Sequence, residues 1–522
     1  MLKKLHGRKL AVCLLGGAMY ALFSAFGWQA EHGGVIWAGG ALLVAALLVW
    51  PIAALLAVLL ERGYTRALRQ EKPFRAGRAF AFMLACYVPM FCVAFPGSFA
   101  YDVPYQLRQV VTGAYSTHHP LLHTLALGGL LQLGRALGDI NLGAALYTAL
   151  QMALLAGCFA LTCGSIARQS GARAAKRAAV FFALYPLNMV MAVNATKDVL
   201  FGGFFALTLA LLNEMQERPS RGLTLKIAVC GALAVMLRNN MAYAALVWLA
   251  LLTIGLRKGE KSAALAVLLA LVVGFGGNAA LKSATHAADG DMSEMLSWPI
   301  QQLARARLYD EERLTDAEKE AIDELMPGEA WACYDPTISD PVKFEFDTQT
   351  FRADVKKYVG VWLSVGKKCA GTYLDATMAL TYPFFYPYRE YRVSGYYVQM
   401  GMSDAYDAGW CDFDPPESRS LFPRALASLS WRFGAKGAMQ IPVVGWLFNM
   451  GVIVWTMLFF ALREMYWGRW RRFGTALLPV LLWGTFLLGP VMAGRYIYPF
   501  VCALPVLAAR PGRSVKEAAR HG

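Results

Sequence analysis

The chain has 522 residues, of which 57% are hydrophobic and only 16% are charged, and its mean hydropathy is +0.41. Soluble globular proteins carry about 25% charged residues, so this composition excludes an ordinary soluble domain and predicts an all-α integral membrane protein. The formal net charge of +15 would suit a nucleic-acid-binding protein, but the positive residues follow membrane topology instead, and we expect no nucleic-acid partner.

Apolar runs recur along the chain at roughly the length of 20 residues that crosses the hydrocarbon core of a bilayer. The first run follows "MLKKLHGR" and has no convincing small-residue cleavage site. We therefore expect it to stay as a transmembrane helix rather than to be removed as a signal peptide. We predict about twelve spans, at residues 9–28, 36–60, 79–96, 143–166, 178–193, 199–213, 223–238, 241–256, 262–281, 441–463, 474–492 and 495–510.

Lys and Arg alternate in density between these runs. The segments on one side, which include 61–78, 167–177 and both ends of the chain, hold 28 Lys and Arg, whereas the short segments on the other side hold five. Positive residues gather on the cytoplasmic side of membrane proteins. We therefore predict that both ends of the chain lie in the cytoplasm (N-in/C-in).

A polar segment at 97–142 follows the third run. Its apolar stretch 120–138, "PLLHTLALGGLLQLGRALG", is long enough to cross the membrane. Crossing would invert every later loop and would place the basic segment 167–177 outside, against the charge pattern. We therefore expect the helices within 104–137 to lie along the outer face of the membrane as amphipathic helices.

Residues 282–440 form a long hydrophilic insertion with 24 Asp and Glu and 17 Lys and Arg. By the parity of the spans it faces outside, and we predict a mostly helical extracytoplasmic domain. Thr315 and Glu318 in "LTDAEKEAIDELM" have the spacing of a capping box, which predicts the start of a helix. The stretches 351–366 and 367–380 also read as helices.

Two further features of the insertion leave alternatives open. The aromatic stretch "YPFFYPYREYR" at 382–392 suits packing at a membrane interface or a sugar-binding surface. Cys333, Cys369 and Cys411 lie outside the spans; one pair could form a disulfide, and the sequence does not choose it. The chain thus divides into two N-terminal spans with a basic loop (1–78), a membrane core (79–281), the extracytoplasmic domain (282–440), and C-terminal membrane helices with a basic tail (441–522).

Several short spans end outside in a charge. Only eleven residues separate Lys226 from Arg238, which is a helix of roughly 17 Å against a hydrocarbon core of about 30 Å. Lys197 with Asp198 and Arg495 stand at similar ends. We infer that these ends are sunk below the outer surface around a polar cavity. The alternative is that the arginines are interface anchors and that Lys197 and Asp198 are a surface pair.

Cations, an acid and histidines at one outer cavity suit the chemistry of a lipid phosphate. Lys and Arg donate charge-assisted hydrogen bonds to phosphate, and a carboxylate such as Asp102 can act as general base for a hydroxyl group. His118, His119 and His123 could bind phosphate, transfer protons or ligate a metal, or only orient an interfacial helix. Their spacing is not a metal signature, so the metal ligands stay unknown and a divalent metal is left open.

This arrangement resembles the GT-C superfamily of membrane glycosyltransferases, whose donors are polyprenyl-phosphate-linked sugars. Members place an acidic residue in the first long outer loop of the core, followed by interfacial helices, which correspond here to Asp102 and the helices of 104–137. "HHPLLHTLALGGLLQLG" is similar to the His-Pro segment that follows that loop, and "GRYIYPF" is similar to the Arg-Tyr…Pro near the end of such chains. A second acid that the superfamily often has in or near its loops finds no identified counterpart here.

The chain looks more closely like an uncharacterised bacterial family of multi-span proteins. The matching segments occur in one order and on the predicted outer side. They are "FPGSFAYDVPYQ", "HHPLLHT", "ATKDVLF", "MLRNNMAYA", "MLSWPIQQLARA", "YPFFYP" and "GRYIYPF".

The resemblance implies a glycosyltransferase of the bacterial cytoplasmic membrane with an outward-facing active site. It would move a sugar from a polyprenyl-phosphate donor to a glycan, glycolipid or protein of the cell envelope. The catalytic candidates are Asp102, His118 and His119. The candidates for binding substrate or the lipid phosphate are Lys197, Asp198, Arg238 and Arg495, with Gln106, Asn239, Asn240 and Tyr496 as hydrogen bonders of second rank.

Three other functions remain open from the sequence. One is a glycan polymerase or ligase that uses lipid-linked donors. Another is a transporter or flippase of lipid-linked sugars, although no clear half-repeat is visible. The last is a non-catalytic scaffold.

Overall fold

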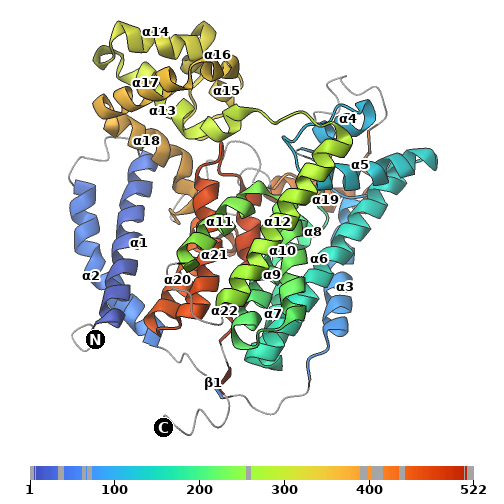
Figure 1. The fold of residues 1–522 in the computed structure, drawn as a ribbon. Helices are drawn as coiled ribbons and strands as arrows, with labels where there is room; N and C mark the ends of the chain where they lie inside the picture. The colour runs from blue at the N-terminus through green and yellow to red at the C-terminus, as the bar shows by residue number, and fades with distance from the viewer. Residues whose placement is uncertain are drawn as a thin grey trace.

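The computed structural model describes residues 5, 7–32, 40–61, 66–67, 73–100, 102–253, 260–387, 398–402, 415–433, 441–510 and 512–513 (Figure 1). These residues form a membrane protein built almost wholly of α-helices, as the composition predicts. Six helices are long and apolar enough to cross a membrane: α1 (Arg8–His32), α2 (Gly40–Glu61), α3 (Ala76–Ala94), α6 (Ile140–Ser170), α9 (Lys197–Glu217) and α12 (Glu260–Thr285).

Shorter helices occupy the other predicted spans. They are α7 (Ala172–Leu184), α8 (Pro186–Ala192), α10 (Arg221–Leu237), α11 (Asn239–Thr253), α20 (Met450–Tyr466), α21 (Trp470–Leu487) and α22 (Tyr498–Ala508).

Two of the predicted spans differ most clearly from the helices in the structure. The run 178–193 is not one helix, because the chain breaks at Tyr185 (φ −65°, ψ 121°) and Pro186 opens α8. A residue before proline is driven out of the helical region. The run 441–463 begins too early: a short 3₁₀ turn, η7 (Val444–Leu447), precedes Asn449, whose side chain accepts from the Val452 amide and caps α20.

Helix α9 lies at the centre of the bundle. Nearly all of its side chains are buried, and α6, α10 and α22 pack around it (Figure 1). Helices α1 and α2 form a separate pair at one side that packs against α20. Lys9 at the start of α1 pairs with Glu61 at the end of α2, and the Tyr466 hydroxyl donates to the same carboxylate. Residues 66–67 (β1) and 512–513 (β2) form a two-residue parallel ladder.

Two helices, α4 (Val103–Thr112) and α5 (Leu121–Ala136), lie within the predicted non-crossing segment. They pack on each other at one end of the bundle, and α5 lies against the first turns of α6 (Figure 1). Helices α5 and α6 cross very closely at Gly143: a Cβ at this position would stand 2.2 Å from the Leu130 carbonyl oxygen. Glycine at this position therefore sets the placement of α5.

A small helical domain with its own apolar core fills much of the long insertion. In Figure 1 it lies at the same end of the bundle as α4. The Ser339 amide donates to the Pro490 carbonyl at 2.9 Å, which joins the domain to the loop after α21. Its elements are η2 (Met292–Leu296), α13 (Ser297–Tyr309), η3 (Glu311–Arg313), α14 (Asp316–Leu325), η4 (Pro327–Cys333), α15 (Asp340–Lys343), α16 (Thr348–Ala353), α17 (Val355–Lys368) and α18 (Ala370–Thr381).

The domain confirms some expectations and corrects others. The capping box of Thr315 and Glu318 is present at the start of α14. The stretch 351–366 is wrong as a single helix, because the chain breaks at Asp354 (φ −146°), which caps α17 by accepting from the Lys357 amide. Helix α18 lies where a helix is predicted.

The aromatic stretch after α18 is not a surface in its described part. Tyr382, which opens the turn η5 (Tyr382–Phe384), is buried together with Phe384 to Tyr386 in the main core. Residues 388–392 lie outside the described residues. Cys333 and Cys369 are both free thiols, and Cys411 lies outside the described residues. The last described helix of the insertion is α19 (Pro423–Phe433).

Candidate functional site

The Asp102 carboxylate is surrounded by positive and imidazole groups from three distant parts of the chain. Its Oδ2 accepts from Lys197 Nζ at 3.0 Å and from an Arg495 terminal nitrogen at 3.1 Å, and it lies 3.8 Å from His119 Nδ1. Lys197 is the first residue of α9, and Arg495 lies in the 3₁₀ turn η8 (Gly494–Ile497) before α22. The structure therefore brings four of the predicted site residues together.

Burial and the surrounding charges determine the protonation states of Asp102 and His119. Burial alone would raise the pKa of Asp102, but Arg495, Lys197 and His119 together hold it well below its usual range. Burial lowers the pKa of His119 to about 3, against the opposing effect of Asp102. At neutral pH Asp102 is therefore a carboxylate and His119 a neutral imidazole. The Asp102 side chain is 24% exposed, so a small molecule can reach it.

A second ion pair lies next to the first, and Arg495 contacts the acid of each pair. Asp198 is fully buried and pairs with Arg238, the residue between α10 and α11; Arg495 Nε lies 3.8 Å from the other oxygen of Asp198. The Arg238 guanidinium lies 4.4 Å from the ring centroids of both Phe486 and Tyr496. This geometry holds Asp198 and Arg238 in the protein interior, where they support Arg495 instead of facing a ligand.

A short backbone ladder explains why Asp102 meets Lys197. The Ser98 amide donates to the Val193 carbonyl, and the Ala195 amide donates to the Ser98 carbonyl, both at 2.8 Å. Thr196 then caps α9 by accepting from the Asp198 amide. The Asn194 side-chain amide is buried and donates to the Gln399 carbonyl at 2.8 Å, which gives this segment a further contact.

Gln106 belongs to a buried hydrogen-bonded network rather than to the exposed site. Its side chain contacts His123 Nδ1 at about 3 Å. The Tyr147 hydroxyl contacts His123 Nε2 at 2.8 Å and donates to Gln151, whose amide donates to the carbonyls of Ala192 and Asn194. The network thus connects α4 and α5 through α6 to the segment that carries Lys197. Tyr147 and Gln151 were missed from sequence, although two polar side chains spaced i, i+4 in an apolar span are a usable signal.

The remaining candidates lie around the same end of the bundle. His118 is exposed and its ring meets that of His119 edge-on at 4.6 Å. Asn240 donates to the Thr485 hydroxyl at 3.2 Å and so connects α11 to α21. Tyr496 stacks on Phe486 beside Arg238. Asn239 is exposed and faces a cavity.

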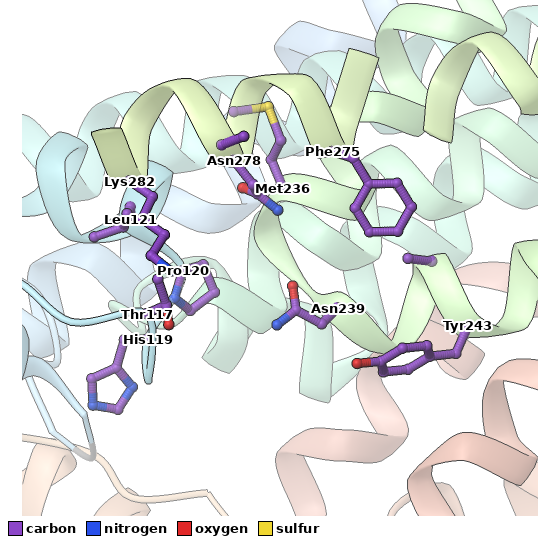
Figure 2. A pocket seen from close by; sticks show the side chains of 12 residues that line it. Thr117, His119, Pro120, Leu121, Met236, Asn239, Tyr243, Phe275, Asn278 and Lys282 are labelled. Atoms are coloured by element: carbon purple, nitrogen blue, oxygen red, sulfur yellow. The ribbon is translucent and has the colours of Figure 1, made fainter. Parts of the chain in front are cut away.

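The cavity, of about 270 Å³, lies between α5, the α10–α11 junction and α12. Figure 2 shows Thr117, His119 and Lys282 at one end, and Phe275 and Tyr243 at the other. His119 is the link to the ion-pair cluster, because its ring contributes to the cavity wall and its Nδ1 faces Asp102.

Three cations, Lys197, Arg238 and Arg495, surround two carboxylates, Asp102 and Asp198, so the cluster carries an excess of one positive charge. Among the described residues, no three His, Cys, Asp or Glu side chains lie together in a group that could hold a metal ion. The two carboxylates of the cluster are already paired with Lys and Arg. The excess of Lys and Arg in this cluster suits an anion.

A family model described as "Family of unknown function (DUF6020)" matches residues 111–521 of the chain, which is most of its length. No curated protein and no solved structure matches it.

Proposed function

The chain belongs to the DUF6020 family, and we propose that it is a GT-C-type glycosyltransferase that takes a sugar from a polyprenyl-phosphate donor. The observation that carries the proposal is the partly exposed Asp102 carboxylate, held between Lys197 and Arg495. His119, whose Nδ1 lies 3.8 Å from this carboxylate, also lines a mixed polar and apolar cavity. A base and phosphate-binding cations side by side are what this transfer requires.

The reaction divides between these groups as follows. An acceptor hydroxyl attacks the anomeric carbon of the sugar, a new C–O bond forms, and the bond from that carbon to the phosphate oxygen breaks. Asp102 takes the proton of the hydroxyl group. Lys197 and Arg495 stabilise the negative charge that grows on the departing lipid phosphate.

The ion pairs explain how one cluster serves both tasks. Before the donor binds, Lys197 and Arg495 hold Asp102 as a weak base with a low pKa. A donor phosphate competes for the same two cations, and this competition raises the basicity of Asp102 when the substrate is present. Asp198 and Arg238 are positioning residues in this scheme, since they contact Arg495 and Tyr496 from the interior.

The position of the cluster suits an outward-facing site. It lies at the end of the bundle that carries α4 and the helical domain (Figure 1), which the charge pattern assigns to the outer side. We propose a bacterial cytoplasmic membrane, with a cell-envelope glycan, glycolipid or protein as the acceptor.

The test replaces Asp102 by Asn and measures sugar transfer from a polyprenyl-phosphate donor in membranes. We expect a loss of about 10²–10⁴-fold, the usual contribution of a positioned acid–base group. Asp139→Asn is the matched control: Asp139 is an exposed acid paired with Arg419, and asparagine still caps α6.

The Asn variant also leaves the cluster with one more uncompensated positive charge. The double variant Asp102→Asn with Lys197→Gln restores the original net charge, so a comparison of its unfolding with that of Asp102→Asn reports the effect of the charge on stability. It lacks a phosphate-binding cation and is therefore not assayed for transfer. Full transfer by a normally expressed Asp102→Asn protein would remove Asp102 from the chemistry.

A further inference from the structure

Helix α19 has one face on the protein core and one face exposed. Leu426, Leu429 and Phe433 are spaced as one face of an α-helix and pack against the main apolar core. Trp431 lies on the other face and is 70% exposed, together with Arg424 seven residues before it. A large exposed aromatic side chain beside a cation is typical of helices that lie in a membrane interface.

Hydrogen bonds place the start of α19 at the end of a membrane-crossing helix. The Leu421 amide donates to the Cys92 carbonyl at 3.1 Å, and the Ser420 hydroxyl donates to the Val93 carbonyl at 2.6 Å. Both carbonyls belong to the last turn of α3, which is long and apolar enough to cross a membrane and buries little of its surface within the protein. Leu421 and Phe422 are 63% and 56% exposed, so these apolar side chains project at the level where the bilayer meets water.

The exposed face carries positive charge in a part of the chain where acids dominate. Residues 418–433 contain three Arg and no Asp or Glu, whereas acids outnumber bases in the insertion 282–440 as a whole. One of the three pairs with Asp139. Arg424 and Arg432 are exposed, and within the described part of the chain neither pairs with an acid. Two such cations next to an interfacial Trp suit the phosphate groups of anionic phospholipids.

We propose that the exposed face of α19 binds anionic phospholipids in the outer leaflet of the membrane. The side chains of Leu421, Phe422 and Trp431 lie among the lipids at the interface, and Arg424 and Arg432 bind lipid phosphate. The hydrogen bonds to α3 favour a bilayer over a second protein as the partner, because they fix the start of this face where a membrane-crossing helix ends. This face is separate from the Asp102 cluster, and the inference does not rest on the proposed transfer.

The same helix supports the segment that leads to the candidate site. The Val398 amide donates to the Phe433 carbonyl at 3.1 Å, and the Phe99 amide donates to the Gly401 carbonyl at 2.9 Å. The short segment that contains Val398 and Gly401 thus lies between α19 and the backbone ladder before α4. A helix that is held at the membrane surface therefore gives this ladder a fixed support.

The test measures how phospholipids with brominated chains quench the Trp fluorescence of the full chain in nanodiscs. The difference between the unaltered protein and Trp431→Phe isolates the emission of Trp431 among the 14 tryptophans. We expect the brominated lipids to quench this emission. The emission of Trp331, isolated in the same way with Trp331→Phe, should not be quenched, because Trp331 packs against the core of the helical domain.

Dilute brominated lipids then report the preference for anionic headgroups. Phosphatidylcholine nanodiscs receive the same small fraction of either brominated phosphatidylglycerol or brominated phosphatidylcholine. We expect phosphatidylglycerol to quench Trp431 at least about fivefold more strongly, since one arginine near a membrane surface attracts anionic lipid by about that factor. The variant Arg424→Gln with Arg432→Gln should remove this preference. The matched control, Arg313→Gln with Arg352→Gln, removes the same charge from exposed positions of the helical domain and should retain it.

Three results would overturn the inference. If neither lipid quenches Trp431, the exposed face of α19 does not meet the membrane and has another partner or none. If the two lipids quench Trp431 equally, or if the preference survives Arg424→Gln with Arg432→Gln, the helix lies at the membrane without an anionic-lipid site. The substituted side chains of α19 are exposed, so these variants should fold as the unaltered protein does. The quenching requires no sugar transfer, so its failure leaves the proposed function standing.

Discussion

The buried pair of Asp198 and Arg238 gives the sharpest prediction for stability. Replacing Arg238 by Met leaves the fully buried Asp198 carboxylate without its main partner. Breaking a buried ion pair costs about 3–5 kcal/mol. Arg495 Nε, at 3.8 Å, compensates in part, whereas the lost contacts with the Phe486 and Tyr496 rings add roughly 1 kcal/mol. We therefore expect Arg238→Met to lower the free energy of unfolding by about 3–4 kcal/mol.

A double-mutant cycle separates the pair from the size of the side chains. Asp198→Leu with Arg238→Met removes both charges, and we expect it to recover most of the loss, with a coupling energy of about 3 kcal/mol. The matched surface pair is Asp139 with Arg419, at 2.6 Å but with side chains 40% and 51% exposed. Its cycle, with Asp139→Asn and Arg419→Gln, should give at most about 1 kcal/mol.

The measurement is equilibrium unfolding in mixed micelles of dodecyl sulfate and dodecyl maltoside at pH 7. Equal coupling energies for the buried and the surface pair would refute the reasoning, because burial would then add nothing to the interaction. A stable and fully active Arg238→Met protein would also remove the supporting role that we assign to this pair in holding Arg495.

Two further predictions concern pH and packing. Burial lowers the pKa of both His119 and His123 to about 3 in the folded protein, whereas an unfolded histidine titrates near about 6.5. Between these two values the unfolded chain binds more protons than the folded protein. The free energy of unfolding should therefore fall as the pH falls from about 6.5 towards 3. Unfolding measured against pH should show a flatter slope for His119→Gln, and an unchanged slope would contradict the buried neutral imidazole. Gly143→Ala should cost about 1–3 kcal/mol, because its Cβ would stand 2.2 Å from the Leu130 carbonyl oxygen. Gly157→Ala on the same helix meets nothing within 4 Å and should gain up to about 1 kcal/mol; similar effects of the two substitutions on unfolding would show that α5 does not need the close crossing.

Much of the fold follows from local signals in the sequence. Each predicted span overlaps at least one helix of the structure, and six helices are long and apolar enough to cross a membrane. A continuous apolar run favours a helix because the bilayer offers the backbone no other hydrogen-bond partners. The predicted boundaries were wrong where a local rule was overlooked. Pro186 forces Tyr185 out of the helix, and the start of α20 is set by the Asn449 cap rather than by hydropathy. The capping box at Thr315 was predicted correctly because both of its partners lie within four residues.

The candidate site shows where sequence reasoning reaches its limit. Charges at the ends of short spans indicated Asp102, Lys197, Arg238 and Arg495, and the structure places them in one cluster. The spacing could not show that Asp102 is partly exposed between Lys197 and Arg495 while Arg238 is buried with Asp198. This division depends on how α9, α10 and η8 meet. Lys282 and Asn278 of the cavity were missed, although polar residues spaced i, i+4 near the end of an apolar helix mark one polar face.

The sequence by itself therefore determined the helical membrane class and the set of ionisable residues that do not belong in a lipid environment, since hydropathy and charge act locally along the chain. Only the tertiary structure decided which acid meets which base and which histidine faces the cavity. Asp102 and Asp198 have the same chemistry. One becomes an accessible carboxylate and the other a buried anchor because the Ser98–Ala195 ladder holds the start of α4 at the surface, while α9 carries Asp198 into the core.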